Sequence, residues 1–297
     1  MPPILKVLIL AIVQGLAELL PVSSSAHVVV AEKLLGLDPS SPQMTLLLVM
    51  LHTGTMFAVI AYFWKEWKGT YFASKEYIRS FVIRSAWAMF FTFLVGYPII
   101  KIIERTMFHG LPRGQIEDLF SRLDLVAAAL FAAGIVILAA GWNEARTISG
   151  TSARAGTTDD ISLRQAGLIG AVQGLCLPFR GFSRSGATIS TGLLLGISRK
   201  RAERFSFALA VILTPPVIAR ESLRLLNYSR DARLTGVALD LHASIVSVLL
   251  GAVFSFLAGL LALRWLSRWL ETGKWYLFGI YCVIAAGGVF YLHLVGY

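Results

Sequence analysis

One unusual motif occurs twice in this chain of 297 residues. The run VQGLAELLPVSSSAH begins at Val13, and the run VQGLCLPFRGFSRSGAT begins at Val172, 159 residues later. In each copy an apolar stretch meets a proline and then serines, the pattern of a helix stopped by proline and a second helix begun by a serine cap. Two broken helices at matching points of the two halves are typical of membrane proteins that bind a ligand between them.

The composition places this chain in a lipid bilayer. Hydrophobic residues make up 56% of the chain and charged residues 15%, whereas about a quarter of the residues of a soluble domain are charged. Cys176 and Cys282 fall within apolar segments without metal-ligand spacing, so they are interpreted as buried hydrophobic residues. Six stretches are apolar and long enough to cross a membrane as helices: 43–64, 82–103, 122–141, 203–225, 243–265 and 275–296.

The remaining apolar segments are too short to cross alone. Residues 4–36 and 162–197 each contain two such segments joined at the Pro/Ser/Gly cluster, and we interpret each pair as a re-entrant hairpin. A hairpin adds no crossing, so each half crosses three times and the second half is inverted. The predicted fold is an all-α integral membrane protein, an inverted-topology repeat with six transmembrane helices and two re-entrant helical hairpins. It comprises a first repeat at 1–142, a polar linker at 143–161 and a second repeat at 162–297.

Basic residues are distributed unevenly between the two faces that this layout defines. The loops 65–84, 142–164, 198–204 and 264–274 carry fifteen Lys/Arg and seven Asp/Glu, against ten and nine on the other face. The positive-inside rule therefore predicts that these loops are cytoplasmic and that both termini lie outside. The net charge of +10 follows mostly from this bias toward lipid headgroups, so no nucleic-acid partner is expected.

The first hairpin carries the residues expected to react. Gln14 and Glu18 lie four apart and share one helix face. A carboxylate in hydrocarbon costs about 2.5–3.5 kcal/mol on insertion scales, so Glu18 is a candidate catalytic residue. Gln14 is a candidate substrate contact, or else a helix-packing amide. The further candidates here are Ser24 and His27 for catalysis, and Ser23 and Ser25 for substrate binding.

The second hairpin supplies positive charge. Arg184, a candidate catalytic residue, presents a fork of donors suited to phosphate oxygens. The glycines let the backbone approach a ligand, and the serines can cap a half-helix whose amides attract anions. With two arginines against one glutamate, the predicted ligand is an anion. The candidate substrate-binding residues here are Arg180, Gly181, Ser183, Ser185, Gly186 and Thr188.

At these residues the chain resembles the undecaprenyl-pyrophosphate phosphatase family, bacterial membrane enzymes associated with bacitracin resistance. The first family motif matches Gln14, Glu18, Pro21, Ser23, Ser24 and His27, and the second matches Gly181, Ser183, Arg184, Ser185, Gly186 and Thr188. The resemblance covers nearly the whole chain. It implies hydrolysis of a polyprenyl diphosphate lipid to the monophosphate and phosphate, assisted by Mg²⁺ or Ca²⁺ that Glu18, and in a second place Gln14, would bind as metal ligands. It also implies the bacterial inner membrane and a pocket reached from the periplasm.

The chain departs from the family pattern at both motifs. Phe179 and Arg180 stand between Pro178 and Gly181, where the family runs proline directly into glycine. In the first motif, Ser25 and the following alanine replace a commoner Thr-Gly. The first departure alters the hairpin tip and is expected to add a phosphate ligand or change the lipid preference, without removing a catalytic residue.

The residues leave the nucleophile open. A phosphohistidine at His27, Ser24 activated by His27, and water activated by Glu18 each place a base beside an acceptor near a cation. Arg184 and the half-helix amides are expected to bind the diphosphate and stabilise the transferring phosphoryl group.

His52, within the span 43–64, is interpreted as structural or as a partner of the site residues.

Other classes of protein share some of these features. A polyprenyl-phosphate or anion transporter, or flippase, would also have inverted hairpins and a basic pocket near the midplane. An intramembrane serine protease could use Ser and His, but a cationic glycine loop suits phosphate better than a peptide. A purely structural protein would gain nothing from three charged residues at the hairpin tips. The oligomeric state is open, and a homodimer is compatible with the sequence.

Overall fold

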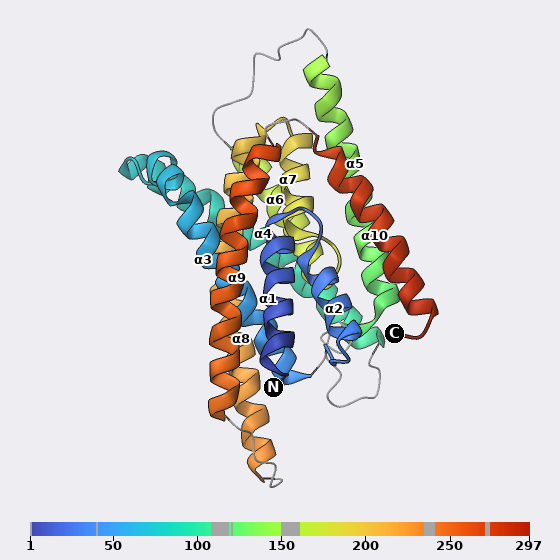
Figure 1. The fold of residues 1–297 in the computed structure, drawn as a ribbon. Coiled ribbons are helices and arrows are strands. Elements are labelled where there is room, and N and C mark those ends of the chain that lie inside the picture. Colours follow the sequence, from blue (N-terminus) through green and yellow to red (C-terminus); the bar gives the residue numbers. More distant parts are fainter. Residues whose placement is uncertain are drawn as a thin grey trace.

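The structure, a computed structural model, describes residues 2–39, 41–107, 119, 121–149, 161–234, 241–270 and 274–297. The regular structure of these residues is helical throughout (Figure 1). In chain order the helices are α1 (Ile4–Leu19), α2 (Ser24–Leu34), α3 (Pro42–Thr70), α4 (Lys75–Met107), α5 (Leu123–Ser149), α6 (Leu163–Cys176), α7 (Arg184–Leu194), α8 (Arg199–Leu234), α9 (Leu241–Leu270) and α10 (Tyr276–Leu294).

Six of these helices are long and apolar enough to cross a membrane. They are α3, α4, α5, α8, α9 and α10, which confirms the six predicted spans. Several extend past their predicted ends, because polar residues do not stop a helix once it leaves hydrocarbon. The clearest case is α5, which continues to Ser149 and makes the first part of the predicted linker helical. Residues 150–160 of that linker lie outside the described residues.

The two short helix pairs, α1–α2 and α6–α7, have the same backbone pattern. Each second helix ends at a glycine with positive φ, Gly36 at 66° and Gly196 at 79°. In both, the residue before the glycine donates its N–H four residues back, from Leu35 to Ala31 and from Leu195 to Thr191. The repeated motif therefore corresponds to a repeated structure. Re-entry of these hairpins into a bilayer stays a prediction.

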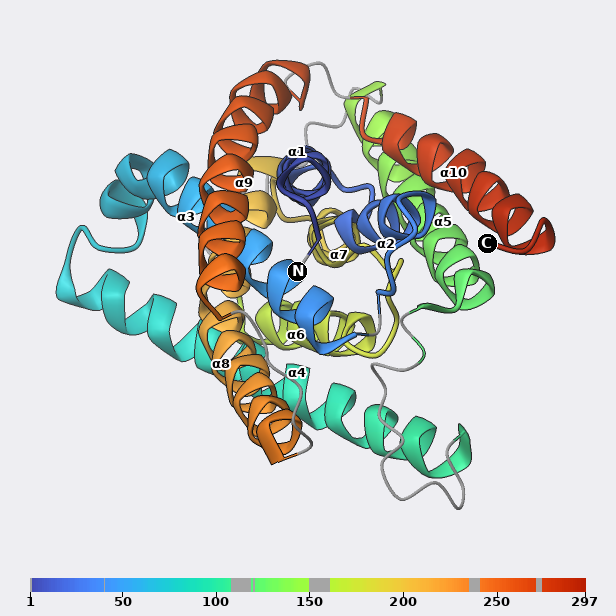
Figure 2. The same ribbon diagram turned by 60° about the horizontal axis from the view of Figure 1, so that its bottom comes forward.

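Each hairpin packs on a long helix of the other half. Helix α1 lies along α9, and α6 lies along α4 (Figure 2). Small residues permit this close approach, since a Cβ at Gly15 would lie 2.8 Å from the Ser255 carbonyl oxygen and one at Gly170 would lie 2.0 Å from that of Ala88. Because the halves are interleaved in this way, the tips of both hairpins reach the middle of the bundle.

The loops lie at the two ends of the bundle in the two groups that the charge pattern predicts. The turn between α3 and α4 and the starts of α8 and α10 lie at one end, whereas both chain termini lie at the other (Figure 1). The hairpin α1–α2 extends inward from the end with the termini, and α6–α7 extends inward from the opposite end. This is the arrangement expected of two inverted repeats.

Candidate active site

The tips of the two hairpins contact each other, as the inverted repeat predicts. The Gly181 N–H donates to Ser25 Oγ at 3.2 Å, and Ser185 Oγ donates to the Leu20 carbonyl oxygen at 3.5 Å. Helix α2 begins at Ser24 and α7 begins at Arg184, so two helix N-termini lie together. Their first-turn amides favour an anion at this position.

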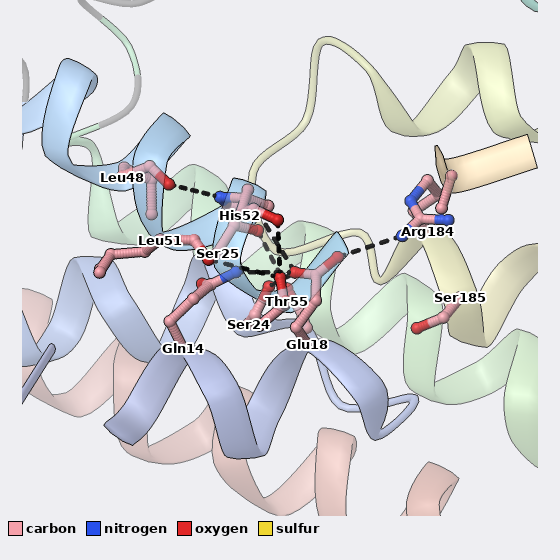
Figure 3. Close-up of polar contacts among 12 residues, drawn as sticks. Gln14, Glu18, Ser24, Ser25, Leu48, Leu51, His52, Thr55, Arg184 and Ser185 are labelled. Carbon is pink, nitrogen blue, oxygen red and sulfur yellow. Dashed lines mark hydrogen bonds and ion pairs between the residues drawn. The ribbon is translucent and has the colours of Figure 1, made fainter. Parts of the chain in front are cut away.

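Glu18 is the centre of a buried polar cluster. Its Oε2 accepts hydrogen bonds from Ser24 Oγ at 2.5 Å and Gln14 Nε2 at 3.0 Å (Figure 3). Its Oε1 accepts one from Arg184 Nη2 at 3.1 Å, and His52 Nε2 lies 3.3 Å from Oε2. The side chain of Glu18 is 14% exposed. Groups from α1, α2, α3 and α7 thus converge on one carboxylate.

His52 belongs to this cluster, which supports the interpretation of it as a partner of the site residues. Its Nδ1 donates to the Leu48 carbonyl oxygen at 2.8 Å, so Nδ1 carries a proton. Its Nε2 can donate to Glu18 only if it also carries one. The geometry therefore fits a doubly protonated ring that adds a second positive charge beside the carboxylate. A polar side chain inside an apolar span was the sequence signal for this residue.

The ring nitrogens of His27 contact Ser23 and Tyr281 rather than Glu18 or Arg184, and the catalytic role expected of His27 stays a prediction. Its Nδ1 lies 2.7 Å from the Ser23 carbonyl oxygen, and its Nε2 lies 2.6 Å from Tyr281 Oη on α10. Residues three apart lie about 60° apart around a helix, so Ser24 and His27 are near neighbours on α2. Ser24 contacts Glu18 on α1, and His27 contacts Tyr281 on α10.

Three predicted substrate contacts serve as caps or inter-helix links in this structure. Ser23 Oγ accepts the Ala26 N–H at 3.4 Å at the start of α2. Ser183 Oγ accepts the Gly186 N–H at 3.1 Å at the start of α7. Thr188 Oγ1 lies 2.6 Å from the hydroxyl of Ser206 and ties α7 to α8. These contacts shape the site, and the role of these residues in binding substrate stays a prediction.

The inserted residues at the second tip add a second arginine, Arg180, whose side chain is half-buried. Gly181 adopts φ +104°, and a Cβ there would lie 2.4 Å from the Val126 carbonyl oxygen. The tip therefore passes over α5 at a point that admits only glycine.

The oxygen atoms around Glu18 are compatible with a divalent cation. Gln14 is fully buried, and its Oε1 has no hydrogen-bond partner. Among the residues that the structure describes, no group of three His, Cys, Asp or Glu side chains could hold a metal. A cation would therefore take Glu18 and, once the Gln14 amide has turned its oxygen toward Glu18 in place of its nitrogen, the Gln14 oxygen. Water or substrate phosphates would complete the shell, as is common for Mg²⁺.

A cavity of about 20 Å³ adjoins the cluster. Glu18, His52 and Arg184 form its polar side, and mostly apolar side chains of α3 and α8, among them Met56 and Val211, form the rest. This volume holds about one water molecule. A diphosphate group would have to widen it.

Fold and site together define an integral membrane protein with a cationic centre buried between two opposed helix N-termini, which is an arrangement suited to phosphate chemistry. The sequence matches the family described as "Bacitracin resistance protein BacA" over residues 7–288, and the chain belongs to this family. The resemblance inferred from the two motifs is thereby confirmed.

Curated relatives span the same length. The chain is 56% identical over 286 residues to "Undecaprenyl-diphosphatase 2" of Acinetobacter baylyi, which covers 96% of each chain. It is 34% identical over 280 residues to "Undecaprenyl-diphosphatase" of Verminephrobacter eiseniae, covering 94% of this chain and 90% of the relative. With "Undecaprenyl-diphosphatase" of Rhodopirellula baltica the identity is 29% over 294 residues, covering 99% and 100%.

Proposed function

We propose that this protein is an undecaprenyl-diphosphate phosphatase. It hydrolyses the diphosphate of a polyprenyl lipid to the monophosphate and inorganic phosphate, and so recycles the lipid carrier for cell-wall synthesis. The observation that carries this proposal is the contact of Arg184 with Glu18 where the N-termini of α2 and α7 meet. The names of the relatives support the same activity.

Binding of the substrate begins with Arg184. Its guanidinium and the amides at the start of α7 bind the diphosphate and stabilise charge on the transferring phosphoryl group. The phosphate oxygens compete with Glu18 for Arg184, so binding frees the carboxylate to accept a proton. The apolar walls that α3 and α8 contribute beside the cavity suit the start of a prenyl chain.

Ser24 is the nucleophile in this proposal, with Glu18 as its base. The 2.5 Å contact between Ser24 Oγ and Glu18 Oε2 supports this route over those that use His27, whose ring nitrogens contact Ser23 and Tyr281. Ser24 Oγ attacks the terminal phosphorus, its proton passes to Glu18, and the bond from that phosphorus to the bridging oxygen breaks. The prenyl monophosphate leaves. Water then hydrolyses the phosphoserine, which releases phosphate and restores the hydroxyl.

Glu18 and Gln14 would hold the proposed divalent cation, Mg²⁺ or Ca²⁺. When bound, the cation supplies positive charge that offsets the charge of the phosphate oxygens. The buried, unpartnered oxygen of Gln14 supports this assignment.

The proposed location is the bacterial inner membrane, with both termini and the mouth of the site on the periplasmic side. The excess of Lys/Arg in the loops at the end opposite the termini supports this orientation. A homodimer stays a prediction, since a single chain does not test it.

The proposed activity is tested by phosphate release from undecaprenyl and farnesyl diphosphate by the detergent-purified protein. We expect release with Mg²⁺ or Ca²⁺ and a loss of release in EDTA that is restored by adding the cation. Arg122→Ala removes an arginine from an exposed ion pair with Asp124 and serves as the control, with the wild-type rate. If wild type releases no phosphate from either lipid, the transporter on the same fold becomes the better hypothesis.

The nucleophile is identified with substrate labelled in its terminal phosphate. A phosphoserine adduct is stable in acid, and we expect it in wild type and in His27→Ala but not in Ser24→Ala. An acid-labile adduct that disappears in His27→Ala would instead establish the phosphohistidine route. Turnover without any trapped adduct would favour water activated by Glu18.

A further inference from the structure

His27 links the first hairpin to the last helix. The Ser23 carbonyl can only accept a hydrogen bond, so Nδ1 of His27 carries the proton in their 2.7 Å contact. In the neutral ring Nε2 is then an acceptor, and Tyr281 Oη donates to it at 2.6 Å. The two rings are nearly parallel, with 9° between their planes. A chain of two hydrogen bonds therefore runs from α10 to the hairpin turn.

That turn holds an unusual backbone conformation. Ser23 has φ 67° and is the one non-glycine residue with positive φ in the described part of the chain. Such a conformation is strained for an L-residue and persists only when its surroundings hold it. The Ser23 carbonyl oxygen accepts both the backbone N–H of His27 at 3.3 Å and its ring N–H. His27 thus holds the strained residue from within α2.

Helix α10 also contacts the other end of this turn. Cys282 Sγ lies 3.6 Å from the Pro21 carbonyl oxygen, next in sequence to Tyr281. Helix α10 therefore contacts the Pro21 end of the turn directly through Cys282, and it reaches the Ser23 end through His27. Ser24, which follows directly, places its hydroxyl on Glu18.

We propose that Tyr281 is a positioning residue of the active site, which acts through His27 and Ser23 to hold the Ser24 hydroxyl against Glu18. This inference rests on the proposed function, because it assumes that Ser24 reacts. A small displacement of a nucleophile costs a large part of the rate. In this role His27 contributes its Nδ1–H bond to the turn, and its ring does not form a bond to phosphorus.

The contact can be removed without disturbing the core. Tyr281 is 46% exposed, and Tyr281→Phe deletes only the hydroxyl. A net hydrogen bond contributes about 0.5–1.5 kcal/mol, so we expect kcat to fall about threefold to tenfold. KM should change little, because Arg184 and its amide neighbours are untouched. Tyr291→Phe, at a more exposed tyrosine of the same helix, is the matched control and keeps the wild-type kcat.

The variant His27→Asn distinguishes the two hydrogen bonds of His27. The asparagine amide can replace Nδ1 as the donor to Ser23, but it does not reproduce the bond to Tyr281. We expect His27→Asn, Tyr281→Phe and the double variant to lose the same factor in kcat, and His27→Ala to lose more. Wild-type kcat in Tyr281→Phe, losses that multiply in the double variant, or inactivity of His27→Asn equal to that of His27→Ala would each overturn the proposal.

A second readout does not depend on phosphate release. Nitrogen NMR of histidine-labelled protein, with His27→Asn to assign the signal, reports which ring nitrogen carries the proton. We expect the proton on Nδ1 in wild type and a shifted Nε2 signal in Tyr281→Phe. An unchanged Nε2 signal would overturn the link between the two side chains. If the signal shifts but wild type releases no phosphate, the link stands and the proposed function fails.

Discussion

Glu18 shows how a charge is retained in the interior of a membrane protein. An isolated carboxylate there costs about 2.5–3.5 kcal/mol, whereas each hydrogen bond to a charged group returns about 1.5–3 kcal/mol. Hydrogen bonds from Gln14, Ser24 and Arg184 reach the two oxygens of Glu18. Removing one partner therefore leaves a charge that is buried and less compensated, which affects both the fold and the reaction.

The contribution of Arg184 is tested by two substitutions. Arg184→Lys keeps the charge but loses the planar fork, so we expect it to lose at least about tenfold in kcat/KM. Arg184→Ala removes the donor entirely and should lose about a hundredfold to a thousandfold. Steady-state phosphate release measures both, with Arg122→Lys as the control at an exposed arginine. Near-wild-type turnover in both variants would show that Arg184 does not bind the reacting phosphate.

At the scale of elements, the two hairpins share one backbone conformation but carry different functional side chains at their tips. The first tip carries the carboxylate and the serines, and the second carries the arginines and glycines. Their contact depends on Gly181, whose N–H reaches Ser25 while its Cα lies against the Val126 carbonyl. The glycine is required both by its positive φ and by the lack of space for a Cβ.

The requirement for glycine at the tip predicts a position-dependent loss of stability. Gly181→Ala should destabilise the protein by about 1–3 kcal/mol, because it combines backbone strain with displacement of α5. Gly196→Ala is the matched control, since Gly196 also has positive φ but has open space around it. Thermal unfolding in detergent should show the larger drop for Gly181→Ala, together with reduced phosphatase activity. Equal drops for the two variants would mean that the approach to Val126 is not limiting.

At the scale of the whole molecule, the site exists because the two halves are interleaved. Helix α1 rests on α9 and α6 rests on α4, so neither half contains the complete arrangement by itself. Glu18 comes from the first half and Arg184 from the second. The prediction that the hairpins enter from opposite faces of the membrane follows from this arrangement.

This topology is tested with two single-cysteine variants, Pro2→Cys and Ser74→Cys, in a background in which alanine replaces Cys176 and Cys282. Position 2 precedes α1 at the end with the termini, and position 74 lies in the turn before α4 at the opposite end (Figure 1). An impermeant thiol reagent added to intact cells should label position 2 but not position 74. Labelling of both positions or of neither would contradict the proposed orientation.

The sequence by itself determined the membrane spans, the hairpin breaks and the meeting of the two tips that carry Glu18 and Arg184. Apolar length sets the spans, proline stops the first helix of each hairpin, and the repeat places the two tips opposite each other. These features depend on local sequence and symmetry, so they could be predicted without knowing how the helices pack.

Which histidine faces the carboxylate was decided by the tertiary structure alone. The sequence favoured His27, which lies close to Glu18 along the chain, but the structure places His52 there and turns His27 toward Tyr281. The outcome depends on the rotation of each helix about its axis, which follows from the left-handed Ser23 and from packing among helices distant in sequence. A polar side chain within an apolar span marked His52 as a candidate, but the helix rotation that brings it to Glu18 depends on packing that the local sequence does not contain.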